Sequence, residues 1–221
     1  MDGVVLINQS TVTTAGGFPY RITQPGSYKL SGNLTVPDAN TTAILITADN
    51  VTIDLNGFGI LGPGVCTNTN DPLSFVVSAC NPLVTGNGVE AQSNLTLSSP
   101  SNIRVVNGSV RGMGRAIVLT GMGSYVEKVL AHSNREGIVV SYGVVTGSTA
   151  SRNLFDGFGG NSTTFSGNNA VGNGRSGFFI NCPGTVVIGN SGLQNGFPND
   201  TNILTLGSLV GCGISGNSFL P

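Results

Sequence analysis

Short apolar runs alternate with small polar residues along most of the chain, and glycine or asparagine interrupts them every few positions. In the segment Val51-Thr52-Ile53-Asp54-Leu55, for example, every second residue is apolar. A two-residue period indicates strands with one buried face, and the frequent β-branched residues favour strands over helices. The pattern therefore predicts an all-β protein built from short strands and tight turns.

The strand pattern recurs with a period of about twenty residues. Four aligned segments begin at Ala116, Gly137, Gly157 and Gly177. Each segment ends near an asparagine, namely Asn134, Asn153, Asn173 and Asn195, and contains a second short strand, at 125–130, 144–150, 164–170 and 185–189. A repeat of this length predicts a solenoid, in which each repeat is one coil that stacks on the next at about 4.8 Å.

Stacking of this kind places equivalent residues of successive coils directly above one another. Inward residues such as Val51, Ile53 and Leu55 are then expected to form apolar stacks. Asparagines at a shared turn are expected to hydrogen-bond to one another as a ladder, and they tolerate the left-handed backbone of tight turns.

The segments DNVTIDLNGFGI (49–60) and SNIRVVNGSVRG (101–112), with the repeats after them, resemble the right-handed parallel β-helix repeat superfamily, which has the pectate-lyase-like fold. The resemblance covers roughly residues 40 to 217 and implies a single-domain right-handed parallel β-helix. Members of this group include pectate lyases, polygalacturonases, alginate epimerases, phage tailspikes and non-catalytic surface proteins. The resemblance therefore implies a fold and leaves the activity open.

Two regions depart from the repeat. Residues 1–40 precede it and contain expected strands at 18–23 and 25–30, so we predict an N-terminal β cap followed by coils over 41–221. Residues 63–87 are rich in Pro, Asn and Thr and predict a long loop.

The four cysteines favour two disulfides, Cys66–Cys80 across that loop and Cys182–Cys212 within the repeats, among three connectivities. This pairing predicts an oxidising setting, secreted or at the cell surface. Four buried free thiols are the alternative.

Composition excludes several classes of function. Charged residues make up 9% of the chain, the net charge is -1, and no basic stripe is present, so nucleic acid is not an expected partner. No apolar run approaches the roughly 18 residues of a membrane helix, and residues 3–7 are too short for a secretion signal. A mean hydropathy of +0.21 argues against disorder.

Candidate chemistry follows from the stacking rule. The residues that directly precede the first residue of each aligned repeat are expected to stack in one column. They are Arg115, Glu136, Asp156 and Ser176. The column beside it contains Arg135, Phe155 and Arg175, and the count also sets His132 beside Arg152.

Glu136 and Asp156 would then lie about 5 Å apart. This is close to the carboxyl spacing of about 5–5.5 Å in retaining glycosidases.

The plainer interpretation of the same residues is a surface ladder of alternating charge, worth about 0–1 kcal/mol per exposed pair. No paired-aspartate or Gly-His-Gly motif of polygalacturonases is present, and no cluster of aspartates resembles a calcium site of the lyases. We therefore expect no cofactor, with calcium as an unsupported alternative. Tyr125, Tyr142 and Phe155 are the aromatic candidates for sugar contacts.

Two hypotheses about function result. The first is an extracellular structural β-solenoid that assembles end to end with copies of itself into a filament, because the first and last segments are apolar and a bare solenoid end pairs with other chains. The alternative is an enzyme or binding module for uronic-acid polysaccharides that uses the outer face near Glu136 and Asp156. As an enzyme it would be a polysaccharide lyase or glycoside hydrolase.

Overall fold

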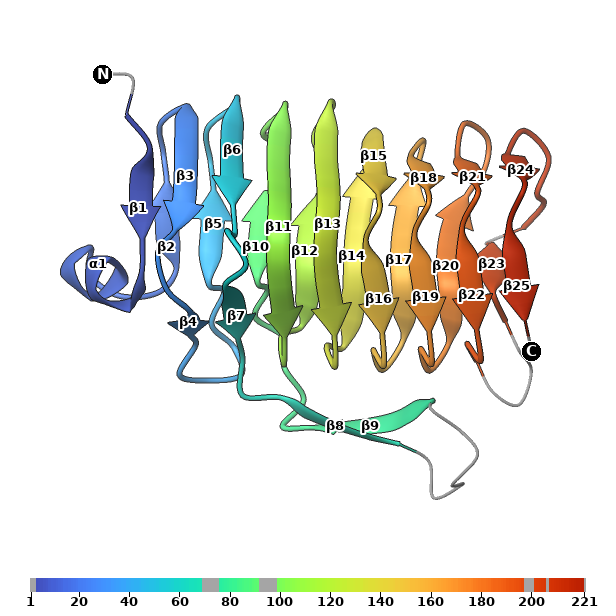
Figure 1. Ribbon diagram of the computed structural model, residues 1–221, viewed down its shortest axis with the longest axis horizontal. Coiled ribbons are helices and arrows are strands. Elements are labelled where there is room, and N and C mark those ends of the chain that lie inside the picture. The colour runs from blue at the N-terminus through green and yellow to red at the C-terminus, as the bar shows by residue number, and fades with distance from the viewer. Residues whose placement is uncertain (1–2, 69–75, 92–98, 197–200, 206, 221) are drawn as a thin grey trace.

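The computed structural model describes residues 3–68, 76–91, 99–196, 201–205 and 207–220. The chain winds into a solenoid of about eight turns, with parallel strands of successive coils side by side (Figure 1). This confirms the predicted all-β coil architecture. In the described residues no helix is long and apolar enough to span a membrane.

The eight-stranded sheet forms one side of the solenoid and takes one strand from each coil. Its strands are β2 (Tyr20–Ile22), β5 (Ile44–Ile46), β10 (Val89–Ala91), β12 (Arg115–Leu119), β14 (Glu136–Ser141), β17 (Asp156–Asn161), β20 (Ser176–Asn181) and β23 (Ile203–Thr205). The expected first strands of the four aligned repeats are β12, β14, β17 and β20.

The fifteen-stranded sheet forms the other side and is bent along its length. One branch contains β1 (Val5–Ile7), β3 (Gly26–Leu30), β6 (Val51–Asp54), β11 (Ile103–Arg111), β13 (Ser124–His132), β15 (Gly143–Thr146), β18 (Thr164–Ser166), β21 (Val186–Ile188) and β24 (Gly213–Ser215). The other contains β4 (Leu34–Thr35), β7 (Gly59–Leu61), β16 (Thr149–Ser151), β19 (Asn169–Val171), β22 (Ser191–Leu193) and β25 (Ser218–Leu220).

The predicted asparagine ladder is present and fully buried. The Nδ2 of Asn134 donates to Oδ1 of Asn153, Asn153 donates to Asn173, and Asn173 donates to Asn195, at 2.8–3.2 Å. Backbone N–H groups of the same residues donate to the next Oδ1 as well. Each asparagine therefore satisfies buried backbone groups at the turn, which are costly when left without partners.

The ladder also explains why three of the four aligned repeats begin with glycine. A Cβ on Gly157 would lie 2.7 Å from Nδ2 of Asn173 and 2.8 Å from the carbonyl oxygen of Gly177. Only a residue without a side chain leaves room for the asparagine amide there.

A second ladder runs along the bend of the large sheet. The backbone N–H of Ser148 donates to Oδ1 of Asn168, Asn168 donates to Asn190, and Asn190 donates to Asn217. It lies where the continuous strand β13 of one coil gives way to pairs of short strands, such as β15 and β16, in the next coils. The turn that breaks the strand is thus stabilised by buried amides.

Apolar columns fill the inside of the coils. Val51, Ile53 and Leu55 are fully buried, as the alternation predicts. Towards the C-terminal coils the core becomes aromatic: the rings of Phe158 and Phe178 stack at 5.0 Å, and Phe165 packs edge-on against both. Stacked side chains in adjacent coils make the core continuous along the axis.

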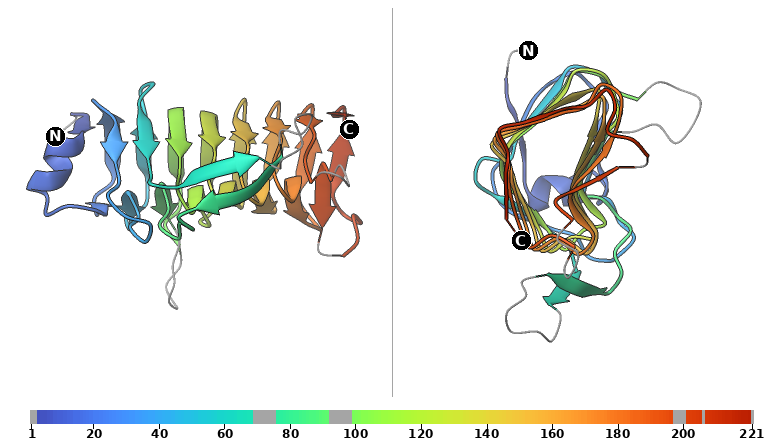
Figure 2. Two further views of the ribbon diagram at one scale, coloured as in Figure 1. Left: turned by 90° about the horizontal axis from the view of Figure 1, so that it is seen from below. Right: turned by 90° about the vertical axis from the view of Figure 1, so that its right-hand side faces the viewer.

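The N-terminal region contains a helix that the sequence pattern did not indicate. Helix α1 (Gln9–Thr14) begins with a capping box between Asn8 and Thr11, and its Val12 is buried. Viewed along the axis, α1 lies inside the outline of the coils and covers that end (Figure 2). The division into a cap of residues 1–40 and coils of 41–221 stays a prediction. Within 1–40, β2 and β3 already pair with β5 and β6 of the long sheets.

Both expected disulfides are present, Cys66–Cys80 and Cys182–Cys212, and the described residues contain no free cysteine. The segment expected as a loop near 63–87 forms an antiparallel hairpin of β8 (Val65–Asn68) and β9 (Val77–Asn81). Cys66 and Cys80 face each other in this hairpin, so the disulfide holds the two strands in register. The hairpin lies across several coils, roughly along the solenoid axis (Figure 2).

Candidate functional site

The predicted column of charges lies at the edge where strands of the eight-stranded sheet begin. Arg115 pairs with Glu136 in the strand register, and Asp156 pairs with Ser176. The backbone N–H of Phe155 donates to the carbonyl of Arg135, and that of Arg175 to the carbonyl of Phe155. Both predicted columns are therefore confirmed as geometry.

The two carboxylates do not form a free pair, because an arginine engages each of them. Nε of Arg115 donates to Glu136 at 2.8 Å. Nε of Arg175 donates to Oδ1 of Asp156 at 2.9 Å, and its Nη2 is paired with Oδ2. The hydroxyl of Ser176 also donates to Oδ1 of Asp156, at 2.6 Å.

Burial distinguishes the two acids. The Asp156 side chain is 7% exposed and both of its oxygens are engaged, whereas the Glu136 side chain is 17% exposed. The hydrogen bonds to Asp156 raise the pKa of the Arg175 guanidinium above its ordinary value. An aspartate held in this way is poorly placed to attack a substrate, and it instead fixes the position of Arg175.

Phe155 lies between two guanidinium groups of neighbouring coils. The guanidinium carbons of Arg135 and Arg175 are each 5.7 Å from the centre of its ring. Arg175 also lies 4.7 Å from the ring of Phe179. Cations within about 6 Å of an aromatic ring are attracted to it, so these contacts order the arginines along the edge.

Arg135 differs from its neighbours in this row. Among the described residues it makes no ion pair, while Arg115 and Arg175 each hold a carboxylate. Its side chain is half-buried, against the ring of Phe155. Within the described part of the chain, Arg135 is therefore the arginine of this row whose charge is not paired with a carboxylate.

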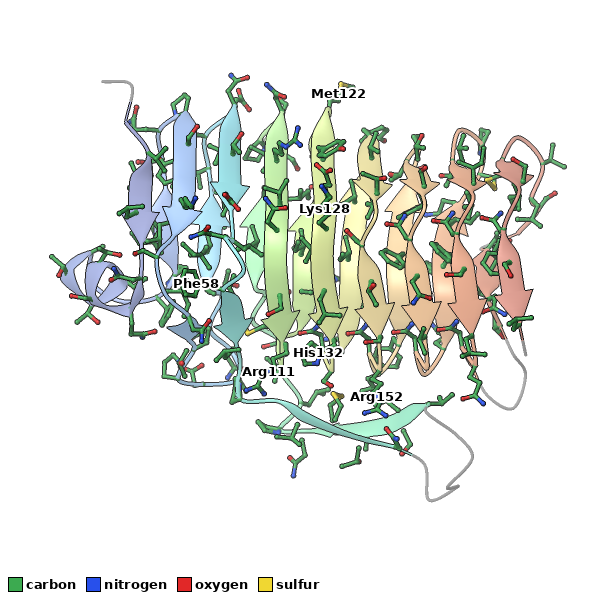
Figure 3. The ribbon with its side chains drawn as sticks, viewed as in Figure 1. Phe58, Arg111, Met122, Lys128, His132 and Arg152 are labelled. Carbon is green, nitrogen blue, oxygen red and sulfur yellow. A yellow bond between two sulfur atoms is a disulfide. The ribbon has the colours of Figure 1, made fainter. Side chains whose placement is uncertain are left out.

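His132 lies one position away from where the sequence count set it. The register pairs it with Arg111 and with Ser151, not with Arg152 (Figure 3). The reason is that the turn after Asn153 has one residue more than the turn after Asn134. The paired ladder residues Asn134 and Asn153 are 19 residues apart, whereas the paired strand residues Ile138 and Phe158 are 20 apart. Burial, followed by the charges of Arg111 and Arg152, lowers the pKa of His132.

A groove of about 580 Å³ lies between the hairpin and the arginine row. One wall consists of Val76, Val77 and Ser78, and the other includes Leu154, Phe155 and Arg175. The backbone N–H of Val77 donates to the carbonyl of Gly172 at 3.3 Å, which holds the hairpin against the coils. A volume of this size is typical of pockets for small ligands.

A smaller polar recess of about 280 Å³ lies further along the same column, lined by Arg115, Arg135 and Glu90 among others. Glu90, which the sequence left as a scattered acid, is buried and accepts hydrogen bonds from Thr42 and Asn87. Arginines of the row thus border two recesses, one on each side of Phe155 along the axis.

Neither the hairpin wall nor Phe179 was among the site residues predicted from the sequence. Val76 and Val77 are about 80 residues from Phe155 in the chain, and nothing in a twenty-residue period relates the two. In the described residues, no group of three or more His, Cys, Asp or Glu side chains is placed to hold a metal ion.

The geometry of the coils allows a comparison with known structures. The tailspike protein gp208 of Dettilon is 16% identical over 83% of this chain, with a TM-score of 0.51. The enzymatically active domain of tailspike protein 2 of bacteriophage CBA120 is 12% identical over 96% of this chain, with a TM-score of 0.52. The fold that this chain shares with the two tailspike structures is the right-handed parallel β-helix, also called the pectate-lyase-like fold.

The similarity concerns the fold, because the identities are low. This chain spans about two fifths of the length of each tailspike chain, 39% and 40%. No family model matches the sequence, and no curated protein matches it.

Proposed function

We propose that this protein is an extracellular or surface β-helix that binds an acidic polysaccharide along the arginine row, from the groove beside the hairpin to the polar recess on the other side of Phe155. The observation that carries the proposal is the row of Arg135, Phe155 and Arg175. Phe155 and Arg175 line the groove opposite Val76 and Val77, and Arg135 lines the polar recess on the other side of Phe155. The two disulfides support an oxidising setting.

The chemistry of the groove suits a sugar chain that carries carboxylates. A pyranose ring presents an apolar face to aromatic and aliphatic side chains, which Phe155 and Val77 supply. A carboxylate on the sugar accepts hydrogen bonds from a guanidinium. Arg135, in the recess next to the groove, is ordered by Phe155 and makes no ion pair with an acid of the described residues. Coils about 4.8 Å apart repeat the surface along the axis, as a polysaccharide repeats its units.

The contacts favour binding over cleavage. Both oxygens of Asp156 are held by Arg175 and Ser176, and Glu136 is held by Arg115. A nucleophile or general acid must reach the scissile bond of the substrate, which an engaged and buried carboxylate does not. The similar domain of the CBA120 tailspike protein 2 is described as enzymatically active. The binding experiment therefore also monitors cleavage of the sugar.

The test is calorimetric titration with a hexamer of galacturonic acid and, separately, with an uncharged hexamer of glucose. The wild-type protein is expected to bind the acidic hexamer more tightly. The variant Arg135→Ala, which leaves no described carboxylate without its arginine, is expected to weaken that binding about tenfold or more.

Arg21→Ala is the matched control, because Arg21 is an exposed arginine of the same sheet outside the groove. It is expected to bind like the wild type. Absence of acidic-hexamer binding in the wild type, or equal binding by Arg135→Ala, would overturn the proposal. Shortening of the hexamer during titration would instead assign a catalytic role to the groove.

A second candidate function is assembly of the protein end to end. The last described coil exposes Val210 and Leu220, at 80% and 57%, and the edge strand β1 region exposes Val4 and Leu6, at 54% and 53%. Leu6 and Leu220 lie on strands β1 and β25, Val4 directly precedes β1, and Val210 lies in the turn before β24. Exposed strand edges with apolar surroundings can pair with other chains. Because α1 covers the core at the N-terminal end, such a contact would be made by the edge of β1.

Light scattering after size exclusion, together with negative-stain microscopy, tests this second function. Concentration-dependent fibres that disappear in Val210→Lys would support assembly. A monomer at all concentrations would exclude it and leave the groove proposal untouched.

A further inference from the structure

A column of left-handed residues runs along the solenoid edge opposite the hairpin. Its members occupy equivalent turns of successive coils and have φ between 50° and 93°: Asn50, Asn102, Gly123, Tyr142, Ser162 and Gly184. The register supports the alignment, since the backbone N–H of Gly123 donates to the carbonyl of Tyr142, and that of Tyr142 to Asn161.

Tyr142 is the exception in this column. Glycine and asparagine adopt positive φ at little cost, and serine is small, but a bulky aromatic residue there is an outlier. Among the described non-glycine residues with positive φ, Tyr142 is the one aromatic residue. Strain of this kind persists where a side chain is needed in a given place.

The strained backbone places the Tyr142 side chain on the surface. Tyr142 is 46% exposed, and it lines the same recess as Met122, which is 71% exposed. These two residues, with Tyr125, Val144 and Ser162, line a recess of about 540 Å³. Met122 and the hairpin lie at opposite edges of the coils, so this recess is distinct from the groove (Figure 3).

Charges near the recess neutralise one another. The guanidinium of Arg104 lies 4.4 Å from the centre of the Tyr125 ring, and its Nη2 is 2.8 Å from Glu127. Glu127 also pairs with Lys128 at 3.4 Å. The recess therefore offers two phenol rings and a thioether with polar atoms at the rim, and the nearby charges are already paired.

We propose that Tyr142, Tyr125 and Met122 form a second saccharide-binding site that takes an uncharged sugar ring. An uncharged pyranose has an apolar face for the Tyr142 ring and hydroxyls for the phenol oxygens and the Ser162 hydroxyl. A recess of this volume fits one or two sugar rings, whereas a stable protein partner would need about 800 Å² of surface on this chain.

The experiment replaces Tyr142, the residue with the strained backbone, and measures both stability and sugar binding. Tyr142→Asn puts a residue that favours the left-handed conformation at this turn, so the melting temperature is expected to stay level or rise. Binding to an array of uncharged glycans is expected to weaken about tenfold or more. Tyr142→Phe keeps the ring and is expected to retain most of the binding.

Several outcomes would overturn this assignment. They are an absence of uncharged-glycan binding by the wild type, unchanged binding by Tyr142→Asn, and a lower melting temperature of Tyr142→Asn without loss of binding. The last result would assign Tyr142 a purely structural role. Failure of the acidic hexamer to bind would concern the arginine row alone, because that test depends on Arg135.

Discussion

Asp156 and Glu136 occupy equivalent positions on neighbouring coils, yet their surroundings differ. The sequence predicted exposed carboxylates in a surface ladder of alternating charge, worth about 0–1 kcal/mol per pair. The expected exposure is wrong for Asp156, because its side chain is buried and is hydrogen-bonded to Arg175 and Ser176. We expect Asp156→Asn to reduce the free energy of unfolding by about 1–3 kcal/mol, and Glu136→Gln by about 0–1 kcal/mol. Urea denaturation of both variants measures this, and equal effects would contradict the assignment of burial.

His132 is the only histidine, so its titration is readily isolated. Its pKa is lowered in the folded state by burial and by Arg111 and Arg152, so the folded protein binds the proton less readily than the unfolded chain. The resulting stability is fully present above the ordinary pKa of 6.5 and is lost as the pH falls from there toward the lowered folded value.

The melting temperature is therefore expected to fall between pH 7.5 and about pH 5, and to fall less in His132→Gln. Asp38 and Asp49 also have lowered pKa values, through hydrogen bonds from Asn40 and Ser101, but they lose their contribution only near and below pH 3.8. If the melting temperature depends on pH equally in the wild type and in His132→Gln, His132 is not the source of that dependence.

The asparagine ladder is the element that most directly ties sequence to structure. Asn173 bonds Asn153 on one side and Asn195 on the other, and its Nδ2 also donates to the carbonyl of Ala150. We expect Asn173→Ala to cost about 2–4 kcal/mol of unfolding free energy, since it leaves buried backbone groups without partners. Asn169→Ala, at an exposed position of the same coil, is expected to change it by less than about 0.5 kcal/mol.

The hairpin is a separate element, because a two-stranded sheet is marginally stable by itself. Replacing Cys66 and Cys80 with serine removes its covalent closure. We expect the far-UV circular dichroism and the cooperative unfolding of the coils to persist, while binding of the acidic hexamer weakens. Global unfolding of the double variant would contradict the view that the hairpin only forms a wall of the groove.

At the scale of the whole molecule, the sequence period predicted the features that recur from coil to coil. It gave no sign of the features that occur once. The asparagine spacing and the alternation at 51–55 predicted the coils, the buried ladder and the column of Arg115, Glu136 and Asp156. The second ladder had a signal that was overlooked, the Gly-Asn pairs at 167–168, 189–190 and 216–217.

The remaining features had no periodic signal. Helix α1 is made of residues with weak helix propensity, so its capping box and the burial of Val12 determine it. The His132 error came from one extra residue at a corner, which a fixed period does not register. The groove depends on how the hairpin folds back over the coils, a contact between segments that share no pattern.

The most direct test of the account is a crystal structure of the protein with the galacturonic acid hexamer. We expect sugar density that runs from the groove between β9 and Phe155 into the recess lined by Arg135, with a carboxylate about 3 Å from the Arg135 guanidinium. An ordered sugar on another face, with the hairpin groove empty, would contradict it.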